Sequence, residues 1–214
     1  MLVKERMTQH PITVSPQTSL FEALTIMRRE KVRRLPVLDE NDKLVGIVLE
    51  RDLLYASPSP ATTLSVYEMN YLISKIKIKD LMSRDVVTVD EDCPLEEAAR
   101  IMVDNSIGGL PVMRGDRLVG LITESDLFKT FLEQLGARAQ GLRVTVKMAE
   151  SKGALARLTN DLTAHGADIV SLSTFWGDDL SNRTIVFKVQ GITQEQVEQI
   201  VGEVDAALVD LRET

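Results

Sequence analysis

The sequence contains very little cysteine and histidine, with one cysteine, Cys93, and two histidines, His10 and His165, among 214 residues. Structural zinc sites and disulfide frameworks need several such side chains, so the composition excludes both. No histidine lies near Cys93 in the sequence, which argues against a catalytic thiol. The sequence also lacks a nucleophile elbow, a Walker loop, a zinc-binding helix motif and a dinucleotide-binding glycine pattern. We therefore expect no enzymatic activity and no required metal or cofactor.

Long apolar runs and an excess of positive charge are also absent. Nowhere do about 18 apolar residues follow one another, so no membrane span is expected, and the charged start Met1–Arg6 does not resemble a secretion signal. The net charge of −7 does not suit a broad nucleic-acid-binding surface. With 44% hydrophobic and 27% charged residues, the composition is that of a globular protein. We expect a soluble, cytoplasmic protein that binds neither membranes nor nucleic acids.

What the sequence does contain is an internal repeat over its first two-thirds. Three pairs of segments match in residue type and order: Met7–Val14 with Met82–Val89, Leu35–Val37 with Leu110–Val112, and Glu50–Leu53 with Glu124–Leu127. The first two pairs lie 75 positions apart and the third 74, so one residue is missing from a hairpin turn of the second repeat. Such a repeat indicates one supersecondary unit built twice. Two related units usually pack face to face, and the cleft between them is a natural ligand site.

Each repeat is predicted to form a strand, a helix, two strands and a helix. The β-branched runs Ile12–Val14 and Val86–Val89 predict the first strands. Apolar residues at helical spacing begin at Leu20 and Leu95. Two residues are predicted to cap these helices: Thr18 in the first repeat and Cys93, ahead of Pro94, in the second. Between the repeats, Ser57–Pro60 is predicted to break a helix and Tyr67–Ile73 to form a connecting one.

The C-terminal third follows a different pattern. Strands are predicted at 143–148, 169–175, 184–189 and 208–211, and helices around 155–165 and 197–204. This βαββαβ order is that of the ferredoxin-like split fold. The fold class is therefore α+β with α/β character: two βαββα units packed as a pair, plus a βαββαβ domain. We expect the first unit at 1–56, a linker at 57–75, the second unit at 76–135, a linker at 136–141 and the last domain at 142–214.

In each repeat an apolar strand runs into a helix start that carries an acid, Asp52 or Asp126. Backbone N–H groups at a helix N-terminus attract anions such as phosphate, and the Thr123 hydroxyl adds a donor there. An aspartate one turn into the helix can accept two hydrogen bonds from a ribose diol. The alternative is structural, because Thr-x-x-Asp before an apolar run also resembles a capping box. The residues alone leave both interpretations open.

The repeat resembles the CBS domain family, whose members normally occur as tandem pairs. The resemblance covers about residues 1–56 and 76–132. It rests on Thr13 and Thr88, on the two Leu-Pro-Val segments, and on the Gly-x-x-Thr-x-x-Asp segment that ends at Asp126. It implies that the pair binds an adenosine-containing ligand, such as AMP, ADP, ATP, NAD or S-adenosylmethionine.

The resemblance also implies two clefts with particular residues in each. In one, Asp126 would hold the ribose and Thr123 would touch phosphate, and the residues near the adenine would be Val87, Thr88 and Leu110. The other would use Asp52, with Ile12, Thr13 and Leu35 near the base. Leu49 stands where the family often has Thr or Ser, and it cannot donate to phosphate. The Asp126 cleft is therefore the stronger candidate.

Arg33 and Arg34 immediately precede the first Leu-Pro-Val segment, whereas the second repeat has Gly108 and Gly109 at these places. In the CBS family a basic residue at this position often points at ligand phosphates. Only one half of the pair therefore offers a basic clamp, which favours a phosphate-bearing ligand over neutral adenosine.

The C-terminal segment 142–214 resembles the ACT domain, a regulatory module that often binds amino acids. The matching stretches are Lys152–Leu155 and Gly166–Ile169, although Ala149 and Lys152-Gly153 replace the family's usual Asp and Pro-Gly. An amino acid ligand is implied, and a structural or dimerising role is the alternative. A CBS pair followed by an ACT-like domain resembles the acetoin utilisation B (AcuB) family.

Together these patterns predict a non-enzymatic sensor. Its CBS pair would bind an adenine nucleotide as a regulatory ligand, and its ACT-like domain would dimerise or bind a second effector. The resemblance adds acetoin or related carbon-source utilisation as the process controlled. Exposed apolar surfaces on both modules would favour a homodimer. The alternative is a ligand-free interaction and dimerisation scaffold that regulates a partner enzyme.

Overall fold

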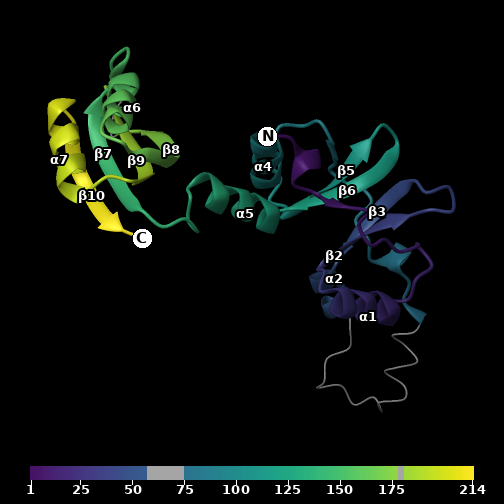
Figure 1. The fold of residues 1–214 in the computed structure, drawn as a ribbon. Coiled ribbons are helices and arrows are strands. Elements are labelled where there is room, and N and C mark those ends of the chain that lie inside the picture. The colour runs from purple at the N-terminus through teal and green to yellow at the C-terminus, as the bar shows by residue number, and fades with distance from the viewer. Residues whose placement is uncertain (57–74, 178–180) are drawn as a thin grey trace. The chain divides into compact units, whose positions relative to one another are not determined.

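In the computed structural model, the chain divides into two units, Met1–Leu127 and Phe128–Thr214 (Figure 1). The structure describes residues 1–56, 75–177 and 181–214. The first unit holds both sequence repeats and the second holds the predicted ferredoxin-like domain. The predicted helix break at Ser57–Pro60 and the predicted connecting helix at Tyr67–Ile73 lie outside the described residues.

The two repeats fold into matching sets of elements. The first contains the 3-10 helix η1 (Val3–Glu5), β1 (Thr8–Gln9), α1 (Leu20–Glu30), β2 (Arg34–Leu38), β3 (Leu44–Leu49) and α2 (Glu50–Tyr55). The second contains η2 (Ile78–Asp80), β4 (Val89–Asp90), α4 (Leu95–Asp104), β5 (Gly109–Arg114), β6 (Arg117–Thr123) and α5 (Glu124–Gln134). Helices α1 and α4 begin 75 positions apart and α2 and α5 begin 74 apart. The missing residue therefore falls in the β5–β6 hairpin, as the sequence offsets predict.

The N-terminal segment of each repeat packs against the other repeat. Strand β1 pairs with β6 of the second repeat, in the sheet β1-β6-β5-β4. Val3 belongs to the hydrophobic core of the second repeat, and its amide donates to the carbonyl of Cys93. Conversely, Ile78 lies in the core of the first repeat, and its amide donates to the backbone carbonyl of Thr18. The two repeats are therefore built from exchanged pieces.

The predicted first strands are much shorter in the structure. Of the run Ile12–Val14, only Val14 pairs, in a parallel bridge with Val37. In the second repeat the strand starts at Val89 rather than Val86, and it pairs in parallel with β5. A β-branched run indicates a preference for extended backbone, but a strand forms only where a neighbour supplies hydrogen bonds.

The two predicted helix caps are each one residue too early. Helix α1 is capped by Ser19, whose Oγ accepts from the amide of Glu22 at 3.2 Å. Thr18 instead accepts from the amide of Ser15 within the preceding turn. In the second repeat, Pro94 is the N-cap residue and α4 begins at Leu95, so Cys93 lies outside the helix. Burial and the nearby Glu97 carboxylate raise the pKa of the Cys93 thiol, which keeps it protonated at neutral pH.

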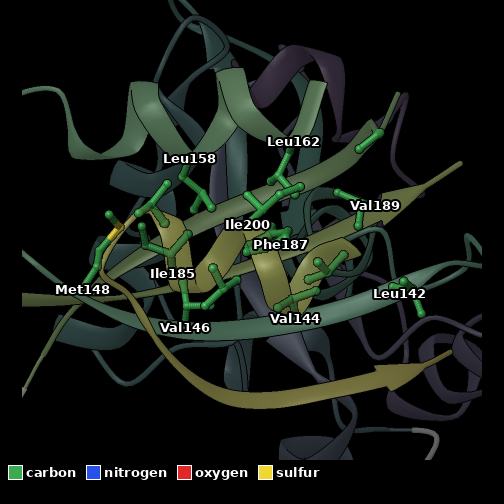
Figure 2. Packing of buried hydrophobic residues seen from close by; sticks show 14 of the residues in the cluster. Leu142, Val144, Val146, Met148, Leu158, Leu162, Ile185, Phe187, Val189 and Ile200 are labelled. Atoms are coloured by element: carbon green, nitrogen blue, oxygen red, sulfur yellow. The ribbon is translucent and has the colours of Figure 1, made fainter. Parts of the chain in front are cut away.

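The second unit has the predicted βαββαβ order. Its elements are β7 (Leu142–Ala149), α6 (Ala154–Ala164), β8 (Asp168–Trp176), β9 (Asn182–Gln190), α7 (Gln194–Glu203) and β10 (Ala207–Glu213). The strands form one antiparallel sheet in the order β10-β7-β9-β8. Figure 2 shows Leu158 and Leu162 of α6 and Ile200 of α7 packed over Ile185 and Phe187 of β9. The fold is therefore α+β, as predicted.

The segment that precedes β7 is fixed to the strands of this sheet. Lys188 is only 3% exposed, and its Nζ donates to the carbonyls of Gly136 at 3.0 Å and Ala139 at 2.8 Å. Ser171 donates to the carbonyl of Leu135, and the side-chain amide of Gln190 donates to that of Gln140. These polar side chains hold the chain that follows α5 against β8 and β9.

Candidate functional site

A cleft of about 400 Å³ opens in the first unit, and both repeats line it. The first repeat contributes Arg33, Arg34, Ile47, Leu49, Glu50 and Arg51. The second contributes Ser83, Asp85, Val86, Val87, Ser106, Ile107, Gly108, Gly109 and Pro111. Val87 is 37% exposed and gives the cleft an apolar surface. The space combines apolar side chains with a few polar and charged groups, as small-molecule sites do.

Three arginines, Arg33, Arg34 and Arg51, line the cleft, and two acidic residues, Glu50 and Asp85, line it as well. The pKa of Arg34 is lowered, chiefly because the side chain is half-buried, and repulsion from Arg33 and Arg51 adds to the effect. Arg34 nevertheless remains charged at neutral pH, because arginine does not lose its proton in proteins. Clustered cations of this kind are relieved by an anion, and guanidinium groups bind phosphate in a forked geometry.

Gly108 and Gly109 give the Arg34 side chain its space. A Cβ atom at Gly108 would collide with Nη2 of Arg34, and at Gly109 it would lie 3.3 Å from its Cδ and Nε. The guanidinium thus passes from the first repeat over the start of β5. The arginines of one repeat meet the glycines of the other, as the sequence asymmetry suggests.

Thr123 and Asp126 are joined at the start of α5. Oδ2 of Asp126 accepts hydrogen bonds from the Thr123 amide at 3.0 Å and from the Thr123 hydroxyl at 2.7 Å. These bonds are those of a helix cap, which is the structural interpretation of Thr-x-x-Asp. In the first repeat, the N-cap residue Leu49 makes no side-chain capping bond. The difference between the two helix starts is therefore present in the structure.

The structure brings some of the predicted site residues together and separates others. Val87, Arg33 and Arg34 line the cleft. Thr88 is exposed and lines a separate hollow with Lys43 and Asp90.

The remaining predicted residues, all of them in the part of the chain that the structure describes, do not line this cleft. Leu110 and Leu35 are 0% exposed in the cores of their repeats, so neither residue lies at the surface of the cleft. Ile12 packs against the first core. The others are partly buried: Thr13, Asp52, Thr123 and Asp126.

Several cleft residues carry no sequence signal that would have identified them. Ser83 and Asp85 lie just after η2, and Ser106 and Ile107 lie between α4 and β5. Arg51 could have been found, because it neighbours Asp52 at the repeated helix start. The others could not, because loop residues follow no periodicity.

The second unit has an open hollow of about 1000 Å³ at the start of α7. Its residues include Gln140, Gln190, Thr193, Glu195 and Glu213. A backbone hydrogen bond and the Thr193 hydroxyl lower the pKa of Glu195, so this carboxylate is ionised at neutral pH. The hollow is polar and negatively charged, unlike the arginine-lined cleft.

Within residues 1–56, 75–177 and 181–214, no three His, Cys, Asp or Glu side chains are grouped to hold a metal ion. Over the same residues, no helix combines the length and apolarity needed to cross a membrane.

Comparison with known families identifies both parts of the chain. The CBS domain model matches residues 3–59 and 78–133, and the TTHA0829-like ACT domain model matches residues 140–212. The CBS matches cover more than half of the sequence, so the chain belongs to the CBS domain family and carries a C-terminal ACT domain. Among solved structures, it is similar to a Vibrio cholerae protein assigned to acetoin utilization (AcuB). The two are 34% identical with a TM-score of 0.53, over 64% of this chain and 95% of that one.

Two further structures contain adenine ligands. A CBS domain pair in complex with 5′-methylthioadenosine and S-adenosyl-L-methionine is 31% identical with a TM-score of 0.52, covering 64% of this chain and 98% of that chain. The protein CBSX2 in complex with AMP is 33% identical with a TM-score of 0.50, covering 61% of this chain and 96% of that chain. CBS pairs related to this chain therefore bind adenine ligands.

Two curated relatives show how the CBS pair is used elsewhere. A CBS domain-containing protein of Dictyostelium discoideum is 33% identical over 63% of this chain and 94% of its own length. An inosine-5′-monophosphate dehydrogenase of Methanocaldococcus jannaschii is 34% identical, but the match covers 64% of this chain and only 25% of the enzyme. The similarity to that enzyme is confined to the CBS region, so it carries no catalytic activity over to this chain.

Proposed function

We propose that this protein is a non-enzymatic sensor that binds an adenine nucleotide in the cleft of its CBS pair. The observation that carries the proposal is the cleft itself, which is lined by three arginines from one repeat and by two glycines and Val87 from the other. Arginines suit phosphate, and an exposed valine suits the face of an adenine ring. The AMP complex of a 33% identical CBS pair supports the same ligand class.

The proposed roles follow the positions of the residues. Arg33 and Arg34 would bind phosphate, and Val87 would contact the base. Thr88 and Leu110 were expected near the base as well, but they do not line this cleft, so we assign them no contact with the ligand. Asp126 would accept from the ribose hydroxyls after exchanging its bonds with Thr123, whose hydroxyl would then be released to phosphate. A second, weaker site would use Asp52, with Ile12 and Thr13 near the base.

The output of the sensor would be a change in the balance between conformations. A ligand that touches both repeats favours one arrangement of them, and only by its differential affinity for that arrangement. The ACT domain would dimerise or bind a second effector such as an amino acid, and a separate partner enzyme would receive the signal in the cytoplasm. Control of acetoin or related carbon-source utilisation is the process we propose, supported by the likeness to AcuB.

The test is ligand-induced stabilisation by AMP, measured as a shift in melting temperature. AMP at about 100 times its dissociation constant should stabilise the fold by roughly 2.7 kcal/mol. For a chain of this size the shift is on the order of 5–10 °C. Asp126→Ala should remove most of the shift, and Asp52→Ala should keep most of it.

Ser19→Ala is the matched control, because it also removes a helix cap but does so at the start of α1, where no ligand contact is proposed. Both Asp126→Ala and Ser19→Ala should melt at a lower temperature without ligand, and only Ser19→Ala should retain the full AMP shift. If Asp126→Ala also retains the full shift, its role is confined to capping α5.

The alternative function is a ligand-free interaction scaffold, and exposed apolar side chains favour it. Tyr55 is 87% exposed and Phe128 is 67% exposed. Native mass spectrometry of the freshly purified protein separates the two proposals. A retained mass of an adenine nucleotide supports the sensor, and the absence of any ligand, together with no response to AMP, supports the scaffold.

A further inference from the structure

The Arg34 side chain has a specific neighbour in the second repeat, the carboxylate of Glu124. The position that a Cβ atom would occupy at Gly108 is contacted by Nη2 of Arg34 and lies 2.6 Å from Oε2 of Glu124. Both side chains therefore converge on the space above Gly108. They come from different repeats, Arg34 from the start of β2 and Glu124 from the first residue of α5.

The electrostatic environment of Arg34 identifies Glu124 as its counter-charge. Burial and the neighbouring Arg33 and Arg51 all disfavour the charged guanidinium, and the Glu124 carboxylate is the group that opposes them. Arg33, Arg34 and Arg51 line the cleft, as do the acids Glu50 and Asp85. Arg34 thus lines the cleft and also lies close to Glu124.

The sequence repeat explains why the arginine comes from the first repeat and the carboxylate from the second. Arg33 and Arg34 of the first repeat correspond to Gly108 and Gly109 of the second, 75 positions later. One repeat supplies the guanidinium, and the other supplies the empty space and the carboxylate. A larger residue at 108 would fill the space in which the two groups meet.

We propose that Glu124 is a specificity-determining residue of the cleft, because it competes with the ligand for Arg34. An anionic ligand must draw the guanidinium from the carboxylate, whereas a neutral ligand leaves the pair intact. Glu124 therefore lowers the affinity for phosphate-bearing adenine ligands and narrows the difference between AMP and adenosine. The inference rests on the proposed function, since it concerns the ligand class of the same cleft.

The experiment is isothermal titration of the full-length protein with AMP and with adenosine. Glu124→Gln removes the competitor and should tighten AMP binding by about two- to fivefold, the size of a weak charge interaction that solvent screens. Arg34→Gln removes the phosphate partner and should weaken AMP binding by about tenfold or more. Neither change should alter the affinity for adenosine by more than about twofold.

The double variant makes the test specific. If Glu124 acts through Arg34, Arg34→Gln combined with Glu124→Gln should bind AMP as weakly as Arg34→Gln alone. Glu96→Gln is the matched control, because it removes one acid from the first turn of α4 in the same repeat but is not among the charges that act on Arg34. It should bind AMP as the unaltered protein does.

The outcomes distinguish the inference from the function on which it rests. AMP binding that is equal in Glu124→Gln and Glu96→Gln overturns the inference and leaves the proposed function intact. A gain from Glu124→Gln that persists without Arg34 also overturns it, since the effect would then be general electrostatics. If the unaltered protein binds neither AMP nor adenosine, both the function and the inference are wrong.

Discussion

At the scale of single residues, two glycines leave the space that the exchanged segments of the repeats occupy. Gly46 and Gly120 occupy matching positions, 74 apart, and each lies against a methionine of the other repeat. A Cβ atom at Gly46 would lie 2.5 Å from Sδ of Met82 and 3.0 Å from the carbonyl oxygen of Ser83, and one at Gly120 would collide with Met7. The sequence displays both glycines in the repeat, but nothing in it names the methionines as their partners.

We therefore expect Gly46→Ala to lower the free energy of unfolding by about 1–3 kcal/mol, the usual cost of overpacking. The control is Gly202→Ala, in α7, where a Cβ atom would meet no atom within 4 Å. That change should instead stabilise the protein by about 0.5–1 kcal/mol, because alanine is the better helix former. Urea unfolding of the two variants measures both values, and equal stabilities would refute the packing argument.

Lys188 is a second residue whose role the sequence does not reveal. The strand pattern predicted its position in the sheet, but not that its charged end would be buried by the segment 136–139. Lys188→Met leaves two carbonyls without their donor, and we expect a loss of about 1–3 kcal/mol of stability. Lys152→Met, at an exposed lysine before α6, should change stability by less than about 0.5 kcal/mol. Losses of similar size in the two variants would contradict a structural role for Lys188.

At the scale of elements, the β2–β3 hairpin contains a pH-sensitive turn. Oδ1 of Asp39 accepts from the amides of Asn41 and Lys43, both at 2.9 Å, and these bonds lower the pKa of Asp39. Because the pKa of Asp39 is lower in the folded protein, its charge stabilises the fold fully at pH values above the pKa of the unfolded state, about 4. This stabilisation is lost as the pH falls through the pKa of the folded state.

Asp39→Asn keeps the shape of the side chain but removes its charge. We expect the variant to melt at a lower temperature than the unaltered protein at about pH 6 and the difference to shrink below about pH 4. Melting curves recorded across this range give the result. A difference that does not depend on pH would mean that the carboxylate charge has no part in the turn.

The elements also show what a sequence pattern can and cannot predict. Leu20, Ala23, Leu24 and Met27 were predicted to face the core from their helical spacing, and all four are buried in α1. The strand Ile12–Val14 was wrong in extent, because its pairing depends on Val37, a residue far along the chain. Helical burial is encoded within a segment, whereas strand pairing is encoded by two distant segments.

At the scale of the whole molecule, we expect at least a dimer in solution. Phe128 and Phe131 of α5 are 67% and 49% exposed, and Val103 of α4 is 77% exposed. Large apolar side chains of this kind usually mark an interaction surface. Sedimentation at micromolar concentration should give a species heavier than the 23.8 kDa chain. Combined Phe128→Ser and Phe131→Ser should shift it toward the monomer, and a single 23.8 kDa species of the unaltered protein would contradict the prediction.

The candidate cleft was predicted from the repeat, and its arginines were predicted from one of the positions where the two repeats differ. The positions of the other proposed residues depend on packing that the sequence does not specify. Leu110 matches a family motif, yet its side chain is wholly buried. Thr88 follows Val87 directly but lies in a different hollow. Neighbours in an extended segment point to opposite sides, and the sequence alone does not say which side faces the cleft.

The exchanged segments have a consequence for how the chain is made. During translation, the first repeat cannot complete its core until Ile78 has left the ribosome, long after α2 has been synthesised. Val3, among the first residues to emerge, has to wait for a partner near Cys93. Contacts between such distant residues close large loops and form slowly. The nascent chain therefore keeps apolar surface exposed until both repeats have been translated, and the two repeats fold together rather than in turn.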